Sequence, residues 1–151
     1  MMSPFRYVFN HIPKTGGISF LALCGQNLPE SEISPHLVEH QLQRAPRERY
    51  EHYRLIRGHF SILSQMRAAP ERYAMTLLRA PIRRIASLYN YWRSYPDQSA
   101  SAVVKAHELS FADFVRYYEE SPDIICNPYT HHFAARGNDS RRENPTHNVR
   151  R

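Results

Sequence analysis

Near the N-terminus, the hydrophobic residues form a short strand pattern that breaks off and resumes as a helix. The strand is predicted from aromatic and β-branched residues, namely Tyr7, Val8, Phe9 and Ile12. Apolar residues resume over Ile18 to Gln26, at a length that favours a helix. A five-residue break containing two adjacent glycines, residues 13–17, separates the two elements.

A second strand followed by a helix is predicted about sixty residues further on. Tyr73 to Leu78 is apolar and ends in Arg79. Pro81 is typical of the first turn of a helix, and the residues after it recur at helical spacing as a core-facing stripe of Ile85, Leu88, Tyr89 and Trp92. Another short strand, Tyr53 to Phe60, lies between the two units.

The remaining segments are more polar. A helix is predicted around His36 to Arg44, a loop from Ser94 to Ser101, and a helix from Phe111 to Glu120 that Ser110 and Asp113 would start. The alternation of strands and helices predicts a parallel α/β sheet flanked by helices, with ligands at the carboxyl ends of the strands. Residues 1–137 are expected to form this single domain, and the polar residues 138–151 a disordered tail.

The break after the first strand has the chemistry of a phosphate-binding loop. Gly16 and Gly17 allow the backbone to approach a ligand closely, and the following helix start favours an anion. Lys14 adds a mobile positive charge. Because Lys14 precedes the glycines, the order differs from the Walker pattern and disfavours an ordinary ATPase.

The second unit offers a complementary anion site. Arg79 stands at a strand end, and Ser87 lies two turns into the following helix. A forked guanidinium contact together with a hydroxyl hydrogen bond would hold one further phosphate.

Together, these segments resemble the nucleotide-dependent sulfotransferases, and in particular their carbohydrate branch. The resemblance implies a P-loop-NTPase-like fold in which Pro13, Lys14, Thr15, Gly16 and Gly17 bind the 5′-phosphosulfate of 3′-phosphoadenylyl sulfate (PAPS), with Ser19 as a nearby hydroxyl. It also implies that Arg79 and Ser87, within Leu78 to Tyr89, bind the 3′-phosphate. Asn127 to Gly137 resembles a further family segment.

The same resemblance assigns the chemistry. His59 is expected to be the general base that accepts the proton of an acceptor hydroxyl, because an imidazole titrates near neutral pH. Lys14 is expected to neutralise charge on the leaving phosphate, and no metal is required. The implied reaction is sulfuryl transfer from PAPS to a carbohydrate-type hydroxyl. His11, beside the loop, is expected to be structural.

The charge balance of the 151-residue chain agrees with an anionic ligand. Its net charge is +6 and its pI is about 9.6, and arginine supplies most of the positive charge. Five scattered arginines are expected on a solvated surface: Arg44, Arg47, Arg49, Arg67 and Arg72. No apolar run approaches the length needed to span a bilayer, and a cytoplasmic protein is expected.

Three alternatives remain open at this stage. The chain ends soon after Gly137, which allows a truncated, inactive domain that binds PAPS, its product or an anionic glycan. His36, Glu39 and His40 match a short zinc-peptidase pattern, His-x-x-Glu-His. The basic charge and ten tyrosines would also suit nucleic acid, but no base-reading motif accompanies them, and no nucleic-acid partner is expected. The oligomeric state is not indicated.

Overall fold

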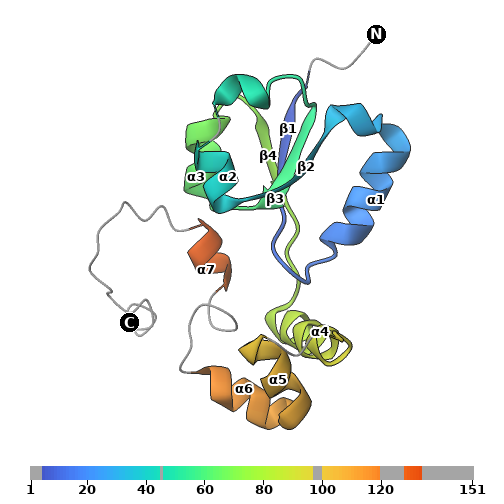
Figure 1. Cartoon of the computed structure of the whole chain (residues 1–151), viewed down its shortest axis with the longest axis vertical. Coiled ribbons are helices and arrows are strands. Elements are labelled where there is room, and N and C mark those ends of the chain that lie inside the picture. The colour runs from blue at the N-terminus through green and yellow to red at the C-terminus, as the bar shows by residue number, and fades with distance from the viewer. Residues whose placement is uncertain (1–4, 45, 97–99, 120–127, 134–151) are drawn as a thin grey trace, which may run out of the picture.

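The computed structural model describes residues 5–44, 46–96, 100–119 and 128–133 and shows an α/β domain (Figure 1). Its sheet has four parallel strands in the order β2-β3-β1-β4. The strands are β1 (Tyr7–Asn10), β2 (Ile33–Val38), β3 (Leu55–His59) and β4 (Tyr73–Thr76). The predicted parallel α/β sheet flanked by helices is confirmed. The predicted tail, residues 138–151, lies outside the described residues.

Helices cover the sheet and continue beyond the carboxyl ends of its strands. In Figure 1, α1 lies on one side of the sheet and α2 and α3 lie on the other, while α4, α5 and α6 group together past the strand ends. The bounds are α1 Gly17–Asn27, α2 Glu39–Arg44, α3 Ile62–Ala68, α4 Pro81–Arg93, α5 Ser101–Glu108, α6 Phe111–Glu119 and α7 Pro128–Phe133, with single 3₁₀ turns at Glu30–Glu32 and Arg47–Arg49. Among these helices, none combines the length and apolarity that crossing a membrane requires.

Side-chain alternation along the strands divides the core between two faces. Val8 and Ile56 point toward α2 and α3, where they join a buried cluster with Leu37, Leu42 and Phe60. Phe9 points to the opposite face and packs on Phe20 of α1, with ring centroids 4.6 Å apart. Because successive side chains of β1 point to opposite faces, this strand contributes core residues to both sides of the sheet.

The apolar stripe of α4 is confirmed, but its partners are helices. Leu88 and Tyr89 are buried, and Ile85 and Trp92 are partly buried. Tyr89 packs with Phe114 of α6 at 5.1 Å between ring centroids and donates a hydrogen bond to the Leu109 carbonyl at 2.8 Å. The second cluster thus holds α4, α5 and α6 together below the strand ends.

The region predicted as a helix from His36 to Arg44 is divided between two elements. His36, Leu37 and Val38 belong to β2, and the helix begins only at Glu39. Strand pairing prevails because it buries Leu37 in the core and places His36 opposite Arg57 of β3. The prediction of a helix over residues 36–38 is wrong.

The prediction that Arg72 lies on a solvated surface is wrong, because its side chain is buried. Its guanidinium donates hydrogen bonds to the Tyr53 carbonyl at 2.7 Å and to the Tyr50 carbonyl at 2.8 Å. It therefore joins the chain before β4 to the segment that leads into β3.

Replacing Arg72 is expected to destabilise the fold. Arg72→Met removes two charged hydrogen bonds and leaves two carbonyls without these donors, so it should lower the free energy of unfolding by about 2 kcal/mol or more. Urea denaturation measures this as a lower midpoint at unchanged slope. The matched Arg67→Met, at an exposed position of α3, should stay within about 0.5 kcal/mol of the parent. Equal midpoints for the two variants would contradict the structural role of Arg72.

Candidate functional site

The loop between β1 and α1 makes a tight turn at the carboxyl edge of the sheet. The Thr15 hydroxyl donates to the Ile12 carbonyl at 2.8 Å, which closes the turn on itself. Lys14 and Gly16 both adopt left-handed backbone conformations, with φ of 67° and 99°. Only a few non-glycine residues adopt that conformation, and they cluster at functional sites. The turn delivers Lys14 and the first turn of α1 to the same edge.

Gly17 sets the distance between this loop and His11. A Cβ atom added to Gly17 would lie 2.1 Å from His11 Cδ2 and 2.3 Å from His11 Nε2. No side chain fits in that space, so the first residue of α1 must be glycine for the His11 ring to keep its place. Gly17 therefore has a packing role of its own.

Arg79 lies directly beside the loop, although 65 positions separate it from Lys14. Its guanidinium donates to the Lys14 carbonyl at 3.4 Å. Burial lowers the pKa of Lys14, and the charge of Arg79 lowers it further. Lys14 Nζ also lies 4.0 Å from the ring centroid of Tyr91 on α4, a cation–π contact. Lys14 and Arg79, which the sequence pattern assigned to the two phosphate sites, therefore lie next to each other in the structure.

Tyr129 of α7 holds Arg79 from the other side. Its hydroxyl accepts a hydrogen bond from the Arg79 N–H at 3.1 Å and donates to the Arg79 carbonyl at 2.5 Å. Tyr129 belongs to the segment from Asn127 to Gly137, which resembles a downstream segment of the sulfotransferases. Asn127 and residues 134–137 of that segment lie outside the described residues.

The other predicted phosphate-contacting residues occupy different surroundings. Ser87 is half-buried on α4, and Ser19 is exposed on α1. Pro13 accepts a long hydrogen bond, 3.5 Å, from Arg84 of α4. Arg84 is 3% exposed and had not been predicted as part of the site. The sequence signal that could have predicted its burial is its position one helical turn before the core-facing Leu88 of α4.

The loop is surrounded by positive charge. The ion pairs recorded among the described residues join Arg47 and Arg72 to Glu71, Arg54 to Glu32, Lys105 to Glu108 and Arg116 to Asp113. Within that part of the chain, Lys14 and Arg79 take part in none of them. Two adjacent cations without a carboxylate partner favour an anionic ligand.

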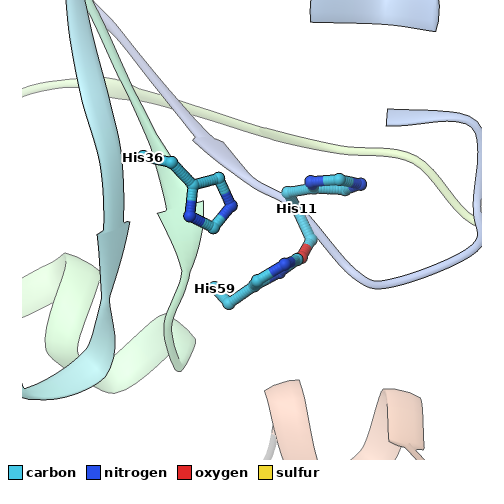
Figure 2. A group of neighbouring side chains, drawn as sticks. All are labelled: His11, His36 and His59. Atoms are coloured by element: carbon cyan, nitrogen blue, oxygen red, sulfur yellow. The ribbon is translucent and has the colours of Figure 1, made fainter. Parts of the chain in front are cut away.

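Three histidines meet at the same edge of the sheet, beside the loop. His11 follows β1 and His59 ends β3, and the pairing of these strands continues with a hydrogen bond from the His11 N–H to the Gly58 carbonyl at 2.8 Å. Their ring centroids are 4.8 Å apart, and the His36 ring of β2 lies 4.4 Å from that of His59. Figure 2 shows the three side chains as neighbours, with the His11 ring extending away from His36.

One hydrogen bond orients the His59 ring. Nδ1 of His59 contacts the His11 carbonyl oxygen, and because a carbonyl only accepts, Nδ1 must carry the hydrogen. In neutral His59, the lone pair is therefore on Nε2. This is the arrangement required of a general base whose orientation is held by a second group.

The environment disfavours the charged form of the two neighbouring histidines. Burial lowers the pKa of His11 to about 4, with further contributions from His59, His36, Arg57 and Lys14. Burial also lowers the pKa of His36, as do His59 and Arg57. His11 was expected to be structural, and its Nδ1 is nevertheless a buried atom with no hydrogen-bond partner among the described residues.

The short zinc-peptidase pattern is not supported by this geometry. His36 lies on β2 and His40 on α2, so the two are not one helical turn apart on one helix. The Glu39 carboxylate instead accepts hydrogen bonds from the Ser61 N–H at 2.6 Å and from the Ser61 hydroxyl at 3.0 Å. Glu39 thus supports the start of α3.

No protein-family model, curated protein or solved structure matches the chain. The class defined by fold and geometry is therefore an α/β domain with an electropositive loop and a histidine cluster at the carboxyl edge of a parallel sheet.

Proposed function

We propose that the protein is a P-loop-like, PAPS-dependent sulfotransferase acting on the hydroxyl of a carbohydrate-type acceptor. The observation that carries the proposal is the contact between Arg79 and the Lys14 loop, two segments far apart in the sequence. A bisphosphate nucleotide has two charged ends, so it requires cations from two segments within its own length. Lys14 and the start of α1 suit the phosphosulfate end, and Arg79 suits the 3′-phosphate, for which the sequence pattern also offers Ser87 on α4.

In the proposed reaction, the acceptor oxygen forms a bond to sulfur while the bond from sulfur to the bridging phosphate oxygen breaks. The acceptor proton passes to Nε2 of His59, whose Nδ1–H is held by the His11 carbonyl. The electron pair of the broken bond stays on the phosphate, where Lys14 neutralises the added charge. Adenosine 3′,5′-bisphosphate leaves.

A groove between α1 and β2 suits the acceptor. Its lining includes Ser34, Pro35, His52, Tyr53 and Arg57. Arg57 stands opposite His36 in the strand register, next to the histidine cluster. Polar and aromatic side chains of this kind are suited to binding a sugar with carboxylate or sulfate groups.

The direct test is transfer of labelled sulfate from PAPS to a panel of glycans by the purified chain, together with calorimetry using adenosine 3′,5′-bisphosphate. We expect one nucleotide bound per chain and a labelled product with at least one anionic glycan. Nucleotide or glycan binding without transfer would identify the alternative, an inactive binding domain. Absence of nucleotide binding would refute the sulfotransferase, and absence of both nucleotide and glycan binding would refute both functions.

A further inference from the structure

We propose that His11, His36 and His59 form a binding site for a zinc-class transition-metal ion. His36 lies within β2, His59 ends β3 and His11 directly follows β1, three neighbouring strands of the sheet. Each side chain offers one ring nitrogen within 4.8 Å of the others. A tetrahedral zinc ion with bonds of about 2.0–2.1 Å places its ligands roughly 3.4 Å apart. Closing the cluster to that separation requires the rings to rotate, and His36 is the most exposed of the three.

Two of the ligand nitrogens are already selected by their surroundings. Nδ1 of His59 is engaged by the His11 carbonyl, which leaves Nε2 for a metal. Metal-binding histidines commonly have their second nitrogen held in this manner. The Nε2 edge of His11 lies against Gly17, whereas its buried Nδ1 has no hydrogen-bond partner in the described part of the chain. A metal ion would supply the partner that this buried nitrogen lacks.

The ligand set also selects the kind of ion. Imidazole suits zinc, copper, nickel and cobalt, whereas magnesium and calcium prefer oxygen ligands. Three protein ligands leave the fourth tetrahedral position open, as in sites that also bind water or a small ligand. Because His36 is exposed, solvent reaches the cluster at least on that side.

Metal binding has a regulatory consequence that rests on the proposed function. A metal bound to Nε2 of His59 would occupy the lone pair that the acceptor proton requires. Zinc is therefore expected to inhibit sulfuryl transfer. The metal site itself does not depend on that reaction and is tested separately.

The test uses the full chain after removal of metals by a chelator and dialysis. We expect one zinc ion per chain by elemental analysis, and a visible absorption band typical of tetrahedral coordination when cobalt(II) is added. His36→Ala, at an exposed strand position, should weaken zinc binding by more than about 100-fold, beyond the loss typical of an outer-shell change. The matched His40→Ala, four residues further on and also exposed, should bind as the parent does.

Two results would overturn the metal site: no stoichiometric zinc binding by the parent chain, or binding that His36→Ala leaves unchanged. Stoichiometry and absorption are read without any sulfate acceptor. A chain that binds zinc but never transfers sulfate would therefore count against the proposed function and support the metal site.

Discussion

Removing the two adjacent cations is expected to abolish nucleotide binding. Lys14→Met and Arg79→Ala each remove a charged hydrogen-bond donor worth about 1.5–3 kcal/mol, which corresponds to roughly 10- to 100-fold in affinity. The double variant lacks both charged donors and should bind no detectable adenosine 3′,5′-bisphosphate. The contact of Arg79 with the Lys14 backbone carbonyl is kept in Lys14→Met, so the loss in that single variant reports the ammonium group alone. Isothermal calorimetry measures all three variants.

The chain contains well-matched controls for both changes. Lys105, the only other lysine, pairs with Glu108 at 2.7 Å on α5, and Arg116 pairs with Asp113 at 3.0 Å on α6. Lys105→Met and Arg116→Ala remove the same charges away from the loop, so they should leave affinity near that of the parent. Parent-like affinity in the Lys14→Met or Arg79→Ala variant, or equal losses in the controls, would contradict the assignment of the loop as the phosphate site.

His59→Asn is expected to stop sulfate transfer while sparing nucleotide binding. The asparagine amide can still donate to the His11 carbonyl, but the variant has no counterpart of Nε2. Loss of a general base lowers kcat by about 10²- to 10⁴-fold. The change should appear in kcat measured with labelled PAPS in the presence of a chelator, with the nucleotide dissociation constant within a few-fold of the parent.

His107→Asn is the control for this change, because His107 is exposed on α5, away from the loop. It should transfer sulfate as the parent does. Unchanged turnover in His59→Asn would refute the base while leaving the nucleotide site intact. Joint loss of turnover and of nucleotide binding would instead indicate that His59 maintains the structure of the loop.

Much of the local structure followed from short-range patterns. The strand at Tyr7, the helix that begins near Ile18 and the α4 helix from Pro81 were predictable, because periodicity and turn residues act over a few positions. Strand β2 (Ile33–Val38) was not predicted, since its residues gain their strand conformation only by pairing with β3. The burial of Arg72 likewise depends on the carbonyls of Tyr50 and Tyr53.

The site divides in the same way. The sequence alone determined the loop chemistry, with Lys14 ahead of two glycines and Arg79 shortly after a strand, because these depend on neighbours along the chain. That strand ends at Thr76, earlier than the predicted Leu78. Only the tertiary structure decided that Arg84 approaches Pro13 and that His11, His36 and His59 converge. Parallel strand register brings the three histidines together, because it aligns residues 23 to 48 positions apart that no local pattern connects. Arg84 reaches Pro13, 71 positions away, from helix α4.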